Sequence, residues 1–171
     1  DGKIHGALRG YGALNQAALP CFLSLMLAKK CGVEHAEIDA AIERSNGFFS
    51  QFIDHGSIGY GYHRPSLEIN ASGRNGMSGN GKNGIAAVAF QLKGNDQGRV
   101  FFAKLTASLY NTMEYGHSGN SYSYFWDPLG ANTGGPHLAS AFLKKMELSY
   151  KQIDQWFLFK KYERNRKFQT F

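Results

Sequence analysis

Apolar and polar positions recur with helical periods along the chain and predict five helices. Residues 13–31 and 84–93 are apolar on nearly every side, as is typical of helices buried inside a protein. Residues 35–54 and 99–115 instead carry an apolar stripe with charged residues opposite it, which is typical of helices with one face in water. A fifth apolar segment covers 136–149. The pattern predicts an all-α protein with inner helices 13–31, 84–93 and 136–149 and outer helices 35–54 and 99–115.

Short and long connections alternate between these helices. The first helix is joined to the second, and the third to the fourth, by short links that favour antiparallel hairpins. Long stretches rich in Gly, Ser, Asn and Tyr follow over 56–83 and 116–135. The inner helices also share a weak repeat, "GALNQAAL", "NGIAAVAF" and "GPHLASAF". Repeated hairpins in two layers predict an α/α toroid or α-solenoid, with all the long loops on one rim.

Length and composition are those of one globular domain. The chain has 171 residues, of which 43% are hydrophobic and 14% aromatic. We treat residues 1–171 as a single domain or as a fragment of a larger toroid, about half of one. No run of 18 or more apolar residues exists, so no membrane span is expected. The first residue is Asp1 and no signal-peptide pattern follows it, so we expect a piece of a longer chain or a processed form.

Positive charge is concentrated at the carboxyl end. The net charge is +6, and residues 151–171 contain six basic residues against two acidic ones, together with several aromatics. This basic aromatic tail fits either a short pair of strands or a sixth helix. A solvated edge, or a surface that docks on another part of the protein, explains it better than nucleic-acid binding by phosphate pairing and base stacking.

Neither the cysteines nor the histidines form a recognisable metal motif. Cys21 and Cys31 would lie about 15 Å apart on one helix, too far for a disulfide, and their apolar surroundings predict buried thiols. Pro20 in the same segment predicts a kink or a restart of the helix. A zinc site made by two loop histidines and an aspartate has no short-spaced ligand pair to support it. No metal and no cofactor is expected.

Candidate catalytic residues lie in the two long loops. His63 follows "GYGY" and His117 follows "YG", and an imidazole titrates near neutral pH, so either could act as general acid or base. Glu68 and Asp127 are the acids well inside the long loops. We predict that the two histidines converge on one pocket at the rim. The alternative is that the histidines cap helix ends and that Asp127, which precedes a proline, is a turn residue.

Side chains suited to holding a ligand accompany these residues. Tyrosine and tryptophan offer flat apolar faces with polar tips that suit sugar rings, and an arginine can grip a carboxylate or sulfate through two hydrogen bonds. The candidate substrate-binding residues are Tyr60, Tyr62, Arg64, Asn83, Tyr122, Tyr124 and Trp126. The tyrosines fit equally well as an aromatic plug packed over the rim.

Several motifs are similar to those of a bacterial protein family known as a domain of unknown function. They are "GYGALNQAALPCFLSLMLAKKCGV", "AIERSNGFF", "GYGYH", "NGKNGIAAVAF" and "YGHSGNSYSYFWDPLGANTGGP", and the resemblance covers about residues 9–150. It implies an all-helical toroid related in shape to terpenoid cyclases, prenyltransferases and six-hairpin carbohydrate enzymes. It also favours a location outside the bacterial cytoplasm, and it carries no established activity.

These expectations lead to two classes of function. One is a carbohydrate-active module, a glycoside hydrolase or polysaccharide lyase, that acts on a glycan or another polar small ligand at the rim. A hydrolase normally needs two carboxylates, whereas a lyase needs a base and a group that neutralises the acid of the substrate. The other class is a non-catalytic module that binds a glycan or peptide, or assembles with other chains. Terpenoid chemistry is a weaker third option, because clusters of acidic residues for a metal-diphosphate are absent from the sequence.

An incomplete toroid also leaves apolar helices without neighbours. Exposed apolar surface of this kind invites a partner. We therefore expect the chain to associate with another chain or with the remainder of its own chain.

Overall fold

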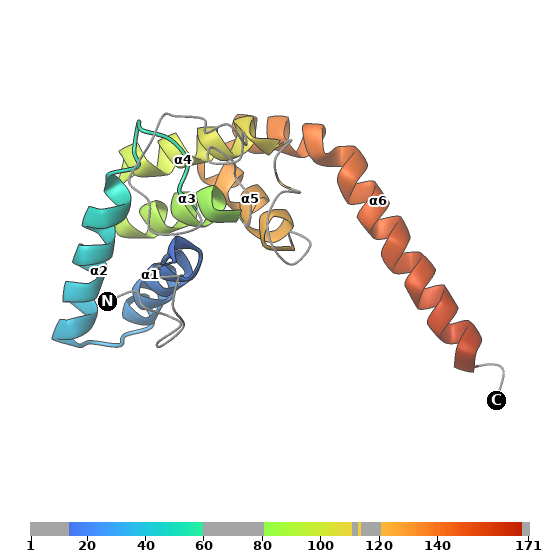
Figure 1. Ribbon diagram of the computed structural model, residues 1–171, viewed down its shortest axis with the longest axis horizontal. Helices are drawn as coiled ribbons and strands as arrows, with labels where there is room; N and C mark the ends of the chain where they lie inside the picture. Colours follow the sequence, from blue (N-terminus) through green and yellow to red (C-terminus); the bar gives the residue numbers. More distant parts are fainter. Residues whose placement is uncertain (1–13, 60–80, 111–112, 114–120, 169–171) are drawn as a thin grey trace.

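The computed structural model describes residues 14–59, 81–110, 113 and 121–168, with residue 121 and those beyond 155 described by the backbone alone. In this part of the chain the regular elements are six α-helices, with no β-strand. They are α1 (Asn15–Lys30), α2 (Ala36–Ser50), α3 (Lys82–Lys93), α4 (Asp96–Ser108), α5 (Ser121–Thr133) and α6 (Pro136–Phe168), shown in Figure 1. The prediction of an all-α protein is confirmed for these residues.

Three short connections join the helices into hairpins. Between α3 and α4, Gly94 adopts a left-handed backbone with φ of 78°, and the side chain of Asn95 accepts a hydrogen bond from the Gly98 N–H at 2.9 Å. The side chain of His35 likewise accepts a bond from the Glu37 N–H at the start of α2. Gly135, with φ of 99°, precedes Pro136 at the first position of α6, where a missing N–H costs nothing. The chain is therefore a series of hairpins, α1–α2, α3–α4 and α5–α6.

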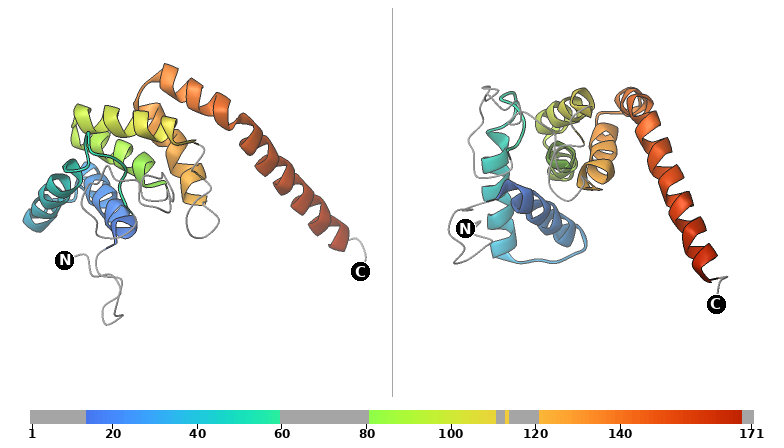
Figure 2. Two further views of the ribbon diagram at one scale, coloured as in Figure 1. Left: turned by 45° about the horizontal axis from the view of Figure 1, so that its top comes forward. Right: turned by 45° about the vertical axis from the view of Figure 1, so that its right-hand side comes forward.

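Helix α3 lies at the centre of the assembly. It packs against α1, α4 and α5, while α2 packs on α1, and α6 packs on α4 and α5. The α1–α2 hairpin and helix α6 lie at opposite ends of the molecule in Figure 1, and the two further views in Figure 2 agree. The main core follows from this order, because a chain of aromatic contacts crosses it. Phe22 of α1 contacts Phe49 of α2 (ring centroids 5.9 Å apart) and Phe90 of α3 (6.5 Å), and Phe90 stacks on Phe102 of α4 (5.6 Å).

In the first two hairpins, the helix predicted to be inner buries more residues than the helix predicted to be outer. Helix α1 buries five residues and α2 two, and in α3 eight of twelve residues are buried. The boundaries of α1 and α3 lie within two residues of those predicted, and α1 runs through Pro20 without interruption. Helix α4 begins three residues earlier than predicted, because Asn95 caps it, and ends at Ser108 rather than at 115.

The prediction that 136–149 is an inner helix is wrong. Only Phe142 and Met146 are buried over this range. The inner position of the third hairpin belongs to α5, which packs on α3 and α4 and which lies within a stretch predicted to be loop. Two serines, one glycine, one asparagine and a proline among its thirteen residues give α5 weak helical propensity, so packing against α3, rather than local sequence, stabilises it.

A hydrogen bond from α6 explains how α5 tolerates Pro128. Proline has no N–H, so the carbonyl four residues earlier, that of Tyr124, loses its helical donor. The hydroxyl of Tyr150 donates to that carbonyl at 3.2 Å, and the two tyrosine rings meet edge to face with centroids 5.9 Å apart. A long-range contact thus replaces the missing helical bond, and the α5–α6 hairpin is stabilised at the same point.

The predictions for the tail and the cysteines are also resolved. Residues 151–168 are helical, as the second half of α6, which extends away from the body of the molecule in Figures 1 and 2. Cys21 and Cys31 are exposed, so the prediction of buried thiols is wrong. Among the described helices, α1 packs mainly against α2 and α3, and its apolar residues go around the helix on more sides than those two neighbours cover.

Candidate functional site

The amino ends of α1 and α3 meet the segment that follows α2, and the amino end of α5 meets the start of α3. Asn83 of α3 accepts a hydrogen bond from the Ile58 N–H (3.3 Å) and donates one to the Ser57 hydroxyl (3.2 Å), and Asn15 of α1 donates to the Gly59 carbonyl (3.1 Å). The Gly81 N–H, at the start of α3, donates to the Ser123 hydroxyl of α5 at 2.9 Å. We call this region, made by the first turns of α1, α3 and α5 with residues 57–59, the amino-end rim. It supports the prediction that the starts of the inner helices 13–31 and 84–93 lie together, but the third start at this rim is that of α5 and not that of 136–149.

Glycines allow α3 and α5 to approach each other closely at the rim. Gly81 has φ of 67°, and a Cβ there would lie 2.6 Å from the Tyr122 carbonyl oxygen. A Cβ at Gly84 would lie 2.5 Å from the Trp126 carbonyl oxygen and 2.7 Å from Asp127 Oδ1, and one at Gly130 would lie 2.4 Å from the Cα of Gly84. Backbone is thus packed directly on backbone. As a result, the carboxylate of Asp127 is held over the first turn of α3.

Lys82 and Asp127 place two ionisable side chains in the buried interior of the rim. The Lys82 side chain is only 5% exposed and Asp127 is fully buried. Burial lowers the pKa of Lys82 to about 8, against the opposing effect of the Asp127 charge. Removing an ammonium group from water is costly, and its position at the positive end of the α3 dipole adds to that cost. The nearby carboxylate offsets part of both.

Tyr150 adds a third titratable group close to Asp127. Its pKa is raised to about 12, first by burial and then by the negative charge of Asp127 and by Tyr124. A phenol with so high a pKa stays protonated at neutral pH, so it acts as a hydrogen-bond donor rather than as a base. The donor role agrees with its bond to the Tyr124 carbonyl.

The aromatic candidates of α5 point in different directions. Tyr122 is half exposed, whereas Tyr124 and Trp126 are partly buried, Tyr124 against Tyr150 and Trp126 against the main core. Of this group, Tyr122 is the one placed to offer a ring to solvent. Asn83 is fully buried, and its hydrogen bonds hold residues 57 and 58. Its predicted contact with a substrate stays a prediction.

Other candidates fall outside the described residues. They are His63, His117, Glu68, Tyr60, Tyr62 and Arg64. The predicted convergence of His63 and His117 therefore stays a prediction, as does the role of Arg64 in holding an anion.

The structure corrects the interpretation of Asp127 and brings forward three residues that the sequence did not single out. Asp127 lies inside α5 and is fully buried, so the alternative of a turn residue is wrong. Lys82, Ser123 and Tyr150 were not among the candidates. One signal was available for Lys82, since a charged residue stands at the start of a helix that is apolar on nearly every side. No such signal pointed to Tyr150, whose role depends on a contact across 26 residues.

Two kinds of site receive no support from the part of the chain that is described. Within it, His, Cys, Asp and Glu side chains do not gather in groups of three or more that could hold a metal ion. Nor does any of the described helices combine the length and apolar character needed to cross a membrane.

Comparison with known proteins identifies the family. A family model described as "Domain of unknown function (DUF6288)" matches residues 2–167. Because the match covers nearly the whole sequence, the chain belongs to this family, in agreement with the resemblance noted from its motifs. No curated protein and no solved structure matched the chain.

Proposed function

We propose that the chain is a carbohydrate-active module of an α/α toroid and that it binds an acidic glycan at the amino-end rim. Three successive helical hairpins with α3 and α5 on the inside are the repeat from which such a toroid is built. Tyr122, whose backbone lies beside the start of α3 and whose side chain is half exposed, supplies an apolar platform of the kind that suits a sugar ring.

The single observation that carries the proposal is Lys82 at the start of α3. Three helix amino ends meet at the rim, and each carries a partial positive charge. Lys82 lies in the first turn of α3 and is shielded from water, so the field of its ammonium is less screened than at the surface. Asp127 cancels part of that field but not the helix dipoles. The rim should therefore attract a carboxylate or sulfate of a sugar more strongly than a neutral hydroxyl.

Among enzymatic activities, polysaccharide lyase chemistry fits this rim better than hydrolysis. In such a reaction a base removes the C5 proton of a uronate, the C4–O bond breaks, a C4–C5 double bond forms, and the leaving oxygen receives a proton. A cationic environment stabilises the charge that develops on the uronate carboxylate. A hydrolase would require a second carboxylate opposite Asp127, for which the sequence offers Glu68, outside the described residues.

A non-catalytic glycan-binding module is the second candidate. The burial of two candidate residues favours this function, because Asp127 and Asn83 are both inaccessible to solvent. Asn83 also makes hydrogen bonds with Ser57 and Ile58. In this case the polar cluster shapes the rim, and exposed side chains such as Tyr122 make the contacts.

A panel of oligosaccharides tests the proposal. Uronate-containing, sulfated and neutral oligosaccharides of matched length are titrated by calorimetry and then incubated with the protein. We expect acidic members to bind at least about tenfold more tightly than neutral ones, a difference of about 1.4 kcal/mol. An ultraviolet-absorbing unsaturated product would identify a lyase, and new reducing ends without that absorbance a hydrolase. Equal affinity for acidic and neutral members, or no binding at all, would contradict the proposal.

A further inference from the structure

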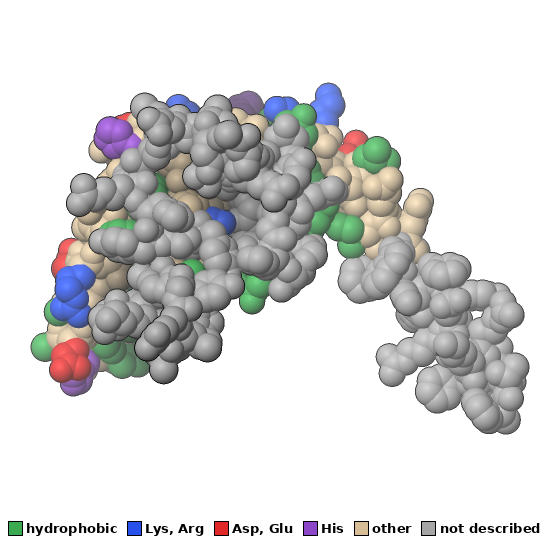
Figure 3. All heavy atoms as spheres, viewed as in Figure 1, with side chains coloured by type: hydrophobic (Ala, Val, Ile, Leu, Met, Phe, Trp, Pro, Cys, Tyr) green, Lys and Arg blue, Asp and Glu red, His purple; other side chains and the backbone are tan. Residues whose placement is uncertain are grey.

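Helix α6 leaves the body of the molecule just after Tyr150. Phe142 and Met146 of α6 are buried in a small apolar cluster, and Tyr150 packs against the same cluster. Of the next five side chains, those of residues 151–155, four are exposed and one is partly exposed. Figure 3 shows hydrophobic side chains at the place where α6 leaves the body. For the side chains that the structure describes, Tyr150 therefore stands where the contact of α6 with the body ends.

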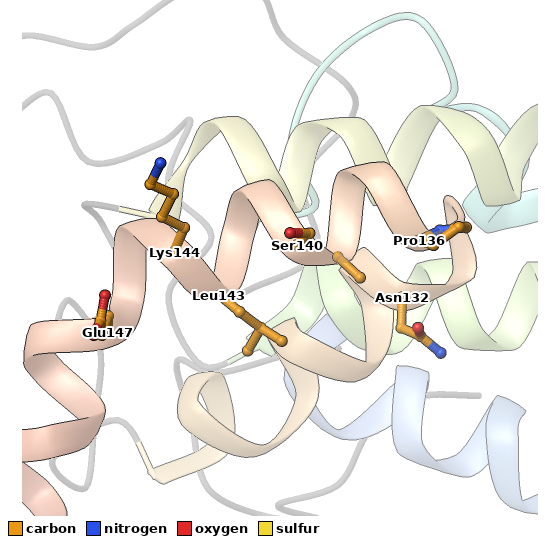
Figure 4. Close-up of a pocket in the computed structure, with 7 residues that line it drawn as sticks. Asn132, Pro136, Ser140, Leu143, Lys144 and Glu147 are labelled. Atoms are coloured by element: carbon orange, nitrogen blue, oxygen red, sulfur yellow. The ribbon is translucent and has the colours of Figure 1, made fainter.

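A groove interrupts the packing of α6 on α5 before that point. It has a volume of about 560 Å³ and is lined by Asn132 of α5 and by residues of α6 that include Ser140, Leu143 and Glu147. Figure 4 shows these side chains around it. Because the two helices are not packed continuously along their length, the contact at Tyr150 contributes more to the position of α6 than it would in an uninterrupted interface.

Two contacts join Tyr150 to Tyr124 of α5, and we call them the Tyr150 clamp. The Tyr150 hydroxyl donates to the Tyr124 carbonyl at 3.2 Å, and the two rings meet edge to face with centroids 5.9 Å apart. A phenol has one proton to donate, and a carboxylate is a stronger acceptor than a carbonyl. Asp127 follows Tyr124 by three residues, so it lies on the same side of α5. The clamp therefore depends on how strongly the Asp127 charge attracts that proton.

Asp127 also connects the clamp with the start of α3. A Cβ at Gly84 would lie 2.7 Å from Asp127 Oδ1, which places the carboxylate over the first turn of α3, the turn that contains Lys82. Charges in such a buried position are weakly screened. Burial is the main cause of the lowered pKa of Lys82 and of the raised pKa of Tyr150, and in both cases the charge of Asp127 comes next. One carboxylate thus acts on a group of the rim and on a group of the clamp.

We propose that the charge of Lys82 at the amino-end rim controls, through Asp127, how firmly the Tyr150 clamp holds α6 on α5. While Lys82 is charged, it compensates much of the field of Asp127, and Tyr150 donates to the Tyr124 carbonyl. When the charge is lost, the uncompensated carboxylate attracts the hydroxyl proton and the clamp loosens. Helix α6 can then pivot one turn earlier, at the buried Met146.

The length of α6 amplifies such a change. The helix continues to Phe168, and its later part extends away from the body in Figures 1 and 2. A small rotation at the clamp therefore moves the far end of the helix much more than the near end. The rim and the extended part of α6 become two coupled sites, and this coupling holds whatever ligand the rim binds.

Hydrogen exchange at pH 7 measures the clamp directly. The readout is the exchange rate of amides in residues 136–150 of α6 divided by that of amides in α2, so that a change in global stability cancels. We expect Lys82→Met to raise this ratio at least about threefold, as for the loss of one hydrogen bond. Lys104→Met, at an exposed position of α4, is the control and should leave it unchanged. Lys82→Gln, which keeps a donor without the charge, replaces Lys82→Met if the latter does not fold.

The same substitution in two other backgrounds decides between coupling and packing. Tyr150→Phe removes the hydroxyl and Asp127→Asn removes the buried negative charge, so in either background the neutral residue at position 82 should leave the ratio within about 1.5-fold. A ratio that is unchanged in the wild-type background overturns the proposal, because the charge then does not reach α6. An equal rise in either variant background overturns it as well, because position 82 then acts on α6 without Asp127 or without the clamp.

Discussion

At the scale of single residues, the pair Lys82 and Asp127 controls the character of the rim. A lysine with a pKa of about 8 is still mostly protonated at neutral pH. Keeping this charge out of water therefore destabilises the folded protein, and the nearby Asp127 carboxylate offsets part of that effect. Breaking such a pair by removing one partner is usually more damaging than replacing both, because the other charge stays buried.

The depressed pKa of Lys82 predicts a pH-dependent gain in stability. Between pH 8 and 10 the folded protein releases the Lys82 proton while the unfolded chain retains it, so the free energy of unfolding rises with pH. Over these two pH units the gain from this group should be about 2 kcal/mol. Urea unfolding of the wild type and of Lys82→Met across this range measures it. The rise should be absent from the variant, and identical pH profiles for the two proteins would show that Lys82 titrates as an exposed lysine.

Close packing at Gly84 predicts a severe effect of a single methyl group. An alanine Cβ would lie 2.5 Å from the Trp126 carbonyl oxygen, and backbone cannot move aside as a flexible side chain can. We expect Gly84→Ala to lower the free energy of unfolding by about 3 kcal/mol or more. Gly47→Ala in α2 is the matched control, because nothing lies within 4 Å of its Cβ. That change should be neutral or stabilising by up to about 1 kcal/mol. Similar effects of the two substitutions in chemical denaturation would disprove the close approach of α3 and α5.

At the scale of elements, the hairpin α5–α6 depends on a bond that no local pattern reveals. The Tyr150 hydroxyl donates to the Tyr124 carbonyl, to which Pro128 cannot donate the usual helical hydrogen bond. Tyr150→Phe should therefore cost about 1 kcal/mol of stability. In the Pro128→Ala background, where an N–H is again available to that carbonyl, the same change should cost less. A double-mutant cycle by thermal or chemical unfolding measures this coupling, and strictly additive effects would rule out the proposed compensation.

The same hairpin marks the limit of prediction from the sequence. The periodic recurrence of apolar residues predicts α1 to α4, and Gly or capping residues mark the ends of these helices. It missed α5, whose composition is that of a loop and whose helix is stabilised by contact with α3. A prediction that lacks α5 assigns the segment 136–149 to the inner layer of the third hairpin. In the structure, this part of α6 lies in the outer layer. The sequence placed Asp127 and Trp126 near the rim, but the burial of Lys82 depends on tertiary packing around the start of α3.

At the scale of the whole molecule, three hairpins form an array whose inner helices start at one rim and whose ends expose apolar residues. The rim is made by the first turns of α1, α3 and α5 with residues 57–59, whereas five of the seven large exposed hydrophobic side chains of the described residues lie on α5 and α6. Tyr122 belongs to both groups.

The most direct test of the account is the affinity of one acidic oligosaccharide for the wild type, for Lys82→Met and for the control Lys104→Met, which alters an exposed lysine of α4. Calorimetry is performed at pH 7, where Lys82 is charged, and circular dichroism verifies that the three proteins are folded. We expect Lys82→Met to weaken binding at least about tenfold and Lys104→Met to leave it within about twofold, because an exposed charge is screened by water and salt. Equal affinities for Lys82→Met and the wild type would contradict the claim that the positive potential of the amino-end rim selects the ligand.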